Sequence, residues 1–286
     1  MASTYPAGTP APAGRSLPEG DARSTGRTIR ARHSGPLTDI WSVAIRALRA
    51  LPREPEVIIP SLIIPIFFFA VNIGTLQDFA EAGIAGLDFR AFQLPTAIVF
   101  AITGVSRAPA LVTDIQSGYF DRLLMTPMRR LSLLLGLMVA DIALVLILSL
   151  PVVALGFLVG VRFETGVLGL LLFIGLGGLW GLVFTGFPYA IALKTGSPGA
   201  VGASFILFFP FAFLTTATLP QEQLTGWLAT VATFNPMTYL LAALRSLLYG
   251  GWQPQVLLEG LLAILAVGTV SMSLALAALR GRISRG

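Results

Sequence analysis

The sequence LSLLLGLMVADIALVLILSLPVVALGFLVGV, residues 131–161, decides the fold of this chain. Asp141 is its only charged residue, and about 20 apolar residues in a helix are enough to cross the roughly 30 Å hydrocarbon core of a bilayer. The stretch has no period-2 alternation of apolar and polar residues, which argues against a strand of a membrane barrel. It therefore predicts a membrane-spanning helix.

Other apolar segments of the same kind predict an all-α membrane protein with six transmembrane helices in total. They are residues 57–74, 91–113, 167–193, 200–219 and 256–279. The composition agrees, because only 12% of the 286 residues are charged, against about 25% in a soluble domain. Such a chain has too little polar surface to cover a water-facing globule.

The apolar segment at residues 227–249 is not expected to span the membrane. Asn235 and Pro236 interrupt it in the middle, and Arg245 interrupts its second half. Because neither half is long enough to cross a bilayer, the segment predicts two short helices in a re-entrant or surface hairpin before the last span.

The residues before the first span divide into two parts. Residues 1–36 are rich in proline, glycine and arginine and hold almost no large apolar side chains, so they predict a disordered cytoplasmic tail. Residues 37–55 predict an amphipathic helix suited to the membrane interface, with an ordinary helix packed on protein as the alternative. The residues that define this helix are Trp41, Ile45, Arg46, Leu48 and Arg49. Residues 56–281 form the predicted six-helix transmembrane domain.

The basic residues fall mainly on one side of this topology. With six spans and a cytoplasmic N-terminus, the cytoplasmic side receives the arginines of residues 1–53, those of the loop between the second and third spans, Lys194 and the last arginines of the chain. The outer side keeps Arg90, Arg162 and Arg245. The positive-inside rule favours this orientation, with both termini cytoplasmic. The net charge of +5 therefore reports membrane orientation and not nucleic-acid binding.

The sequence lacks the motifs of an enzyme. It contains no phosphate-binding loop, no His-Glu-x-x-His, no Gly-x-Ser-x-Gly and no cysteine, and its single histidine, His33, lies in the predicted tail. We therefore assign no catalytic, cofactor-binding or metal-binding residue. Asp141 is an acid inside a span, and a structural hydrogen bond to a neighbouring helix is the preferred interpretation over contact with a substrate.

The loop between the second and third spans predicts a short amphipathic helix. Gly118 frees the backbone before it, and Thr126 and Pro127 end it. Tyr119, Phe120, Leu123 and Leu124 form an apolar ridge, and Asp121 and Arg122 lie on the other side. A short rigid helix at the cytoplasmic face can dock a soluble partner, and a simple interfacial loop is the alternative.

This loop carries a family resemblance. The run GYFDRLLMTPMR, residues 118–129, resembles the signature of type-2 ABC-exporter permeases, in particular the daunorubicin-resistance and multidrug branch. The helix at residues 37–55 resembles the connecting helix of that family. Asn235-Pro236 with Arg245 and Gly250 resembles its Asn-Pro…Arg…Gly stretch, and Gly136 to Asp141 its Gly-x-x-x-x-Asp pattern. The resemblance covers roughly residues 38–280. Gln116 departs from it, since many members carry Glu there.

The resemblance implies a permease subunit in the inner (cytoplasmic) membrane of the cell. It implies dimerisation with a second copy or a similar permease, and recruitment of two separate ABC ATPase subunits, which would hold ATP and Mg. The chain itself would bind no cofactor and no nucleic acid. Closure of the ATPases would push residues 118–130 and the connecting helix, and so export amphiphilic drugs or lipids by alternating access. A polysaccharide or glycolipid exporter permease, and an energy-independent channel or scaffold, are the alternatives.

Overall fold

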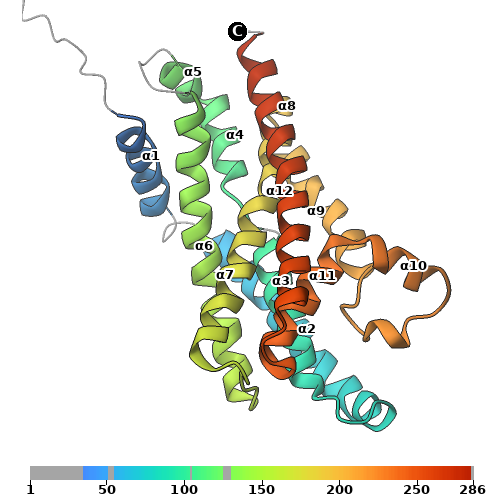
Figure 1. Cartoon of the computed structure of the whole chain (residues 1–286). Coiled ribbons are helices and arrows are strands. Elements are labelled where there is room, and N and C mark those ends of the chain that lie inside the picture. The colour runs from blue at the N-terminus through green and yellow to red at the C-terminus, as the bar shows by residue number, and fades with distance from the viewer. Residues whose placement is uncertain (1–34, 51–54, 104, 125–129, 285–286) are drawn as a thin grey trace, which may run out of the picture. The chain divides into compact units, whose positions relative to one another are not determined.

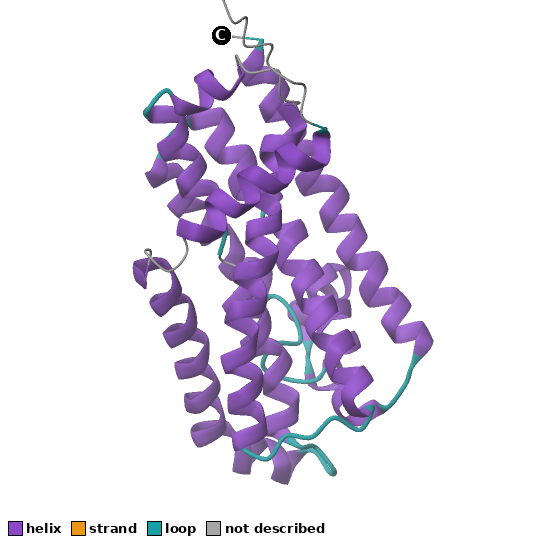
Figure 2. Cartoon of the chain, turned by 90° about the vertical axis from the view of Figure 1, so that its left-hand side faces the viewer, coloured by secondary structure: helices purple, strands orange, loops and turns teal. Residues whose placement is uncertain are grey.

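The computed structural model describes residues 35–50, 55–103, 105–124 and 130–284, and all their regular structure is helical (Figures 1 and 2). The predicted tail, apart from its last two residues, lies outside the described residues. The α-helices are α1 (Pro36–Ala50), α2 (Pro55–Gly83), α3 (Phe89–Thr103), α4 (Ala108–Gln116), α5 (Tyr119–Leu124), α6 (Arg130–Leu158), α7 (Gly166–Phe184), α8 (Gly186–Thr195), α9 (Pro198–Phe213), α10 (Gly226–Phe234), α11 (Pro236–Arg245) and α12 (Pro254–Ile283). A 3₁₀ turn at Gln221–Gln223 and a π-helical turn at Ser246–Gly250 complete them.

Five stretches of the described chain are long and apolar enough to cross a membrane. They are Ile58–Gly83, Phe89–Gln116, Leu134–Leu158, Gly166–Thr195 and Pro254–Arg282. Two of them consist of consecutive helices, α3 with α4 and α7 with α8. Five of the six predicted spans are thus confirmed with shifted ends. Four of them continue past a predicted end into polar flanks, whereas the span predicted at residues 131–161 is shorter, at Leu134–Leu158.

The span predicted at residues 200–219 is wrong as a single helix. α9 has 16 residues, which at 1.5 Å per residue gives about 24 Å, less than the hydrocarbon thickness. The chain leaves the helix at Leu214, and the Thr215 hydroxyl then accepts a hydrogen bond from the Ala217 N–H. This local bond gives the backbone an alternative to the next helical turn.

The predicted break at Asn235 is confirmed, since α10 and the helical segment after it are bent by 83° there. The Asn235 Oδ1 accepts a hydrogen bond from the Met237 N–H at 3.0 Å and so caps α11. Its Nδ2 donates to the carbonyl oxygens of Phe211 at 2.7 Å and Leu214 at 2.9 Å. One side chain therefore holds the start of α11 against the end of α9.

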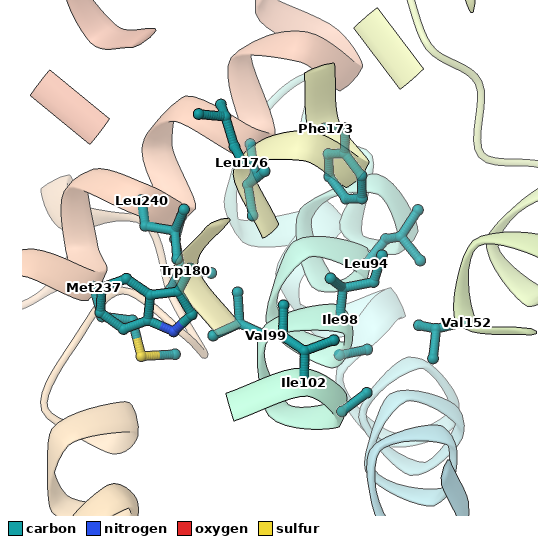
Figure 3. Close-up of a cluster of buried hydrophobic side chains, with 14 of the residues drawn as sticks. Leu94, Ile98, Val99, Ile102, Val152, Phe173, Leu176, Trp180, Met237 and Leu240 are labelled. Atoms are coloured by element: carbon teal, nitrogen blue, oxygen red, sulfur yellow. The ribbon is translucent and has the colours of Figure 1, made fainter. Parts of the chain in front are cut away.

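The largest apolar core surrounds α3. Figure 3 shows Leu94, Ile98 and Ile102 of α3 facing side chains of α6, α7 and α11. Trp180 of α7 is fully buried, and its Nε1 donates to the Thr103 hydroxyl at 3.0 Å. α3 is thus the central helix, whereas α2 leaves most of its side chains exposed.

An amphipathic helix is present as α1, and it packs on protein; residues 51–54 of the predicted helix lie outside the described residues. Its buried face is formed by Val43, Ala44 and Ala47 against α6. A Cβ at Gly136 would lie only 2.6 Å from the Cβ of Val43, so the two helices approach closely because residue 136 is glycine. Trp41 stays 59% exposed, which leaves it available to the membrane interface.

Candidate functional site

The predicted short helix at the loop between the second and third spans is present as α5. α4 ends at Gln116, and Gly118 takes a left-handed conformation with φ of 70°. Glycine adopts this conformation without a Cβ penalty, which explains why the chain turns here before Tyr119. α4 and α5 lie at the same end of the bundle as α1 and the end of α12 (Figure 1).

The structure corrects the predicted apolar ridge of this helix. Phe120 is only 1% exposed and belongs to the same buried cluster as Ile115, Leu193 and Leu279. The guanidinium of Arg282 lies 5.7 Å from the centre of its ring. Consecutive helical residues point about 100° apart, so Tyr119 faces outward when Phe120 faces inward. Phe120 therefore anchors α5 to its own chain and is not available to a partner.

The remaining predicted residues of this element divide into described and undescribed ones. Tyr119 is 37% exposed, and Arg122 is exposed at the same end. The side chains of Asp121, Leu123 and Leu124 lie outside the described parts, as do Thr126 and Pro127 altogether. The exposed side chains of α5 in the described part of this element are therefore Tyr119 and Arg122, which we call the α5 surface.

A bidentate ion pair joins α1 to α4. The Arg46 Nη1 donates to the Asp114 Oδ1 at 3.1 Å, and the Nη2 donates to the Oδ2 at 2.5 Å. The guanidinium also lies 4.8 Å from the centre of the Tyr119 ring. The hydrogen bond to Asp114 raises the pKa of Arg46 above its ordinary value. Paired N–H···O bonds fix both distance and orientation, so α1, α4 and the α5 surface form one connected unit.

Sequence reasoning named Arg46 but missed Asp114. The two residues are 68 positions apart, and nothing in either local pattern marks them as partners. Of the other residues predicted for the N-terminal helix, Trp41 and Arg49 are exposed, and Ile45 and Leu48 are partly buried beside the α1–α6 contact.

Asp141 makes the structural hydrogen bonds that its position predicts. Its Oδ1 accepts from the backbone N–H of Arg107 at 2.7 Å, and its Oδ2 accepts from the Tyr189 hydroxyl at 2.5 Å. All three residues are buried. This carboxyl group therefore connects α6 with α8 and with the junction between α3 and α4, from which the α4–α5 element continues.

Arg245, which the sequence assigns to the outer side of the membrane, is buried inside the helix bundle. Its Nε donates to the Phe92 carbonyl at 3.1 Å, and its Nη1 and Nη2 donate to the hydroxyl and carbonyl of Thr216 at 3.0 and 2.8 Å. A further contact joins Nη2 to the Thr96 hydroxyl at 3.3 Å. The helix continues as a π turn after Arg245 instead of entering a loop, so the side chain stays inside the bundle.

Comparisons with known proteins identify relatives. The family model for "ABC-2 type transporter" matches residues 38–249. The chain is 27% identical over 257 residues to a daunorubicin resistance ABC transporter permease protein of Streptomyces coeruleorubidus, covering 84% of this chain and 86% of the relative. It is 25% identical over 207 residues to a probable doxorubicin resistance ABC transporter permease protein of Mycobacterium tuberculosis, covering 72% and 75%.

A third relative carries no drug in its name. A putative transport permease of Cyanophora paradoxa is 25% identical over 223 residues and is covered, like this chain, to 74%. The family model begins inside α1 and includes the α4–α5 element, Asp141 and Asn235. Because that model matches well over half of the sequence, this chain belongs to the ABC-2 type transporter family.

Proposed function

We propose that this chain is the membrane-spanning permease subunit of an ATP-driven exporter of amphiphilic drugs or lipids. The observation that carries the proposal is the connected unit of α1, α4 and the α5 surface, held by the Arg46–Asp114 ion pair at one end of the bundle. An ABC ATPase pair, which would bind ATP and Mg, would dock there. A second copy of this chain or a similar permease would complete the transporter.

The helices behind this unit give a path for mechanical coupling. α4 belongs to the same membrane span as the central helix α3, and Asp141 holds the α3–α4 junction to α6 and α8. A displacement of the α5 surface would therefore reach the core around α3 through packed helices and hydrogen bonds. This arrangement supports α4 and α5 as the element through which ATP hydrolysis drives transport.

The proposed cargo class has two sources of support. The named drug-resistance relatives are permeases for daunorubicin and doxorubicin resistance. The chain also has an apolar cavity of about 360 Å³ lined by side chains such as Phe184, Phe187, Phe211 and Val267. Apolar ligand sites in proteins are commonly of this size.

The test of this function is reconstitution with the ATPase that co-purifies with the tagged chain. In inside-out vesicles, daunorubicin should accumulate only when chain, ATPase and hydrolysable ATP are all present. The permease alone should bind no ATP, since its sequence has no phosphate-binding loop. Accumulation that is independent of ATP would instead indicate an energy-independent channel.

The orientation of the chain predicts a labelling pattern. The exposed cations Arg46 and Arg49 belong to α1, Arg122 to α5, and Lys194 and Arg280 to the last turns of α8 and α12, whereas Arg90 lies in the first turn of α3 and Arg162 just before α7. α1, α5 and the end of α12 lie at one end of the bundle (Figure 1). The positive-inside rule then places this end in the cytoplasm.

Single cysteines can test this orientation without background, because the chain has none. We expect Glu164→Cys to react with an impermeant maleimide on intact cells, and Lys194→Cys and Arg280→Cys to react only after permeabilisation. All three positions are exposed. The reverse pattern would contradict the proposed orientation.

A further inference from the structure

A small cavity lies between α2, α3 and the chain that follows α9. Its volume is about 30 Å³, and its walls include Phe68, Asn72, Gln93, Thr96, Phe213 and Thr218. Phe68, Phe213 and Thr218 are exposed, so the cavity reaches the surface at these side chains. Its walls are mostly apolar, and Gln93 and Thr96 are buried polar side chains among them, a placement that marks a candidate functional position inside a membrane bundle.

Gln93 in the cavity wall has an unused donor. The side chain is only 1% exposed, and its Nε2 finds no hydrogen-bond partner among the described residues. Buried amide groups almost always have a partner, because desolvation without one destabilises the fold. The contacts of Gln93 within the described chain give no reason for a donor at this place, whereas an acceptor atom of a ligand in the cavity would pair with its Nε2.

The positive charge of Arg245, which is bonded to a side chain of the cavity wall, favours a hydrogen-bond acceptor as the ligand atom. The Thr96 hydroxyl, which also lines the cavity, accepts a hydrogen bond from Arg245 and donates one to the Ala217 carbonyl at 3.2 Å. In the described parts of the chain, no carboxylate lies within salt-bridge distance of Arg245. Its positive charge is thus uncompensated by an acid nearby, and the low dielectric of the surroundings extends its field. An oxygen with negative partial charge is favoured in such a place.

We propose that this cavity binds an acceptor oxygen, such as a quinone or ketone carbonyl, of the exported amphiphile. The Gln93 Nε2 donates the hydrogen bond, and the apolar body of the ligand lies against Phe68 and Phe213 at the opening. The volume is sufficient for one oxygen-bearing group, since about 10–15 Å³ of such space already holds a water molecule. The inference deepens the proposed function, on which it rests, by naming the chemistry that selects the cargo.

Two probes that differ only in oxygen test this site. Anthracene and 9,10-anthraquinone share three fused rings, and only the second carries carbonyl acceptors. Equilibrium binding of both is measured on the full-length chain in lipid nanodiscs and corrected for partitioning into empty nanodiscs. We expect the wild-type chain to prefer anthraquinone by about 5- to 10-fold, the effect of one buried hydrogen bond.

The decisive variant is Gln93→Leu, with Gln93→Met as a second replacement of similar length in case the first does not fold. Either variant should bind the two probes equally and should keep or raise the melting temperature, because it removes an unpaired buried amide. Thr238→Val is the matched control, since the Thr238 hydroxyl is also buried, has no partner among the residues that the structure describes, and lies outside the cavity. That control should keep the preference for anthraquinone.

Two results would overturn the proposal. The first is a wild-type chain that binds anthracene and anthraquinone equally well. The second is a Gln93 variant that keeps the wild-type preference for anthraquinone; if its melting temperature also falls, Gln93 binds a structural water only. Binding is measured without ATPase or ATP, so these results are distinguishable from a failure of ATP-driven daunorubicin accumulation, which would overturn the proposed function by itself.

Discussion

Replacement of Phe120 by alanine should abolish transport by detaching α5 from its own chain. The ring is 1% exposed in a buried cluster that includes residues of α4, α8 and α12. Truncation of such a phenylalanine costs about 3–5 kcal/mol, because it removes buried apolar area and leaves a cavity. We expect a lower melting temperature in detergent and loss of ATP-driven daunorubicin accumulation, with normal membrane levels.

Tyr119→Ala is the matched control, because it removes an adjacent ring that is 37% exposed. It should leave the melting temperature unchanged and weaken recruitment of the ATPase, since exposed aromatic anchors at interfaces typically contribute about 1–4 kcal/mol. Phe120→Leu should restore most of the stability. If Phe120→Ala instead kept full stability and lost only ATPase binding, the ring would face the partner and its burial would be wrong.

Replacement of Asp141 by leucine should have an effect of similar size for a different reason. The change leaves the Tyr189 hydroxyl and the Arg107 N–H buried without their acceptor. Each orphaned group costs about 1–3 kcal/mol, so the total loss should be about 2–6 kcal/mol. The melting temperature and transport should both fall, because α6, α8 and the α3–α4 junction lose their common contact.

Asp141→Asn separates a structural role from an ionic one. Asparagine keeps one acceptor for the Arg107 N–H, and the Tyr189 hydroxyl can reverse its direction toward the amide, so transport should largely persist. Glu259→Leu is a control within another span, since Glu259 bonds only to Gln255 of its own helix in the described contacts; it should change stability little. A folded Asp141→Asn chain without transport would show that the acid acts on cargo or protons.

Much of this fold could be predicted from the sequence because the hydrocarbon of a membrane permits few backbone conformations. A backbone in hydrocarbon must satisfy its own hydrogen bonds, so long apolar segments such as residues 131–161 become helices wherever they occur. The end of α9 could not be predicted in this way, because residues 214–219 hold no charged residue and no proline. A hydrogen bond to the Thr215 hydroxyl and the contacts of Asn235 end that helix, and hydropathy does not register either of them.

The candidate site was only partly predictable for a related reason. The turn at Gly118 and the helix after it follow from local chemistry. The inward position of Phe120 depends on which neighbour α5 packs against, and the partners Asp114 and Tyr189 are distant in the chain. The unpaired amide of Gln93 has no signature in the sequence at all, because a lack of partners exists only in the folded bundle.

The contacts at the α1 end also fix how often the chain crosses the bilayer. Two groups that touch at one face must be separated by an even number of crossings. Arg46 and Asp114 are in contact, and two crossings separate them, namely α2 and the α3–α4 span. Gln116 and Gly196 are joined by a 3.0 Å hydrogen bond, and two crossings separate them as well, namely α6 and the α7–α8 span.

The same rule applies to the last part of the chain, where Arg282 Nη1 donates to the Leu193 carbonyl at 3.3 Å. α12 supplies one crossing between these residues, so the chain from α9 to the π turn must supply an odd number. α9 is too short to do this alone, but Asn235 joins its end to the start of α11. One traverse is therefore completed between α9 and the π turn, where α10 and the helical residues 236–250 together are long and apolar enough for a bent span, and α1 and the end of α12 emerge on the same face.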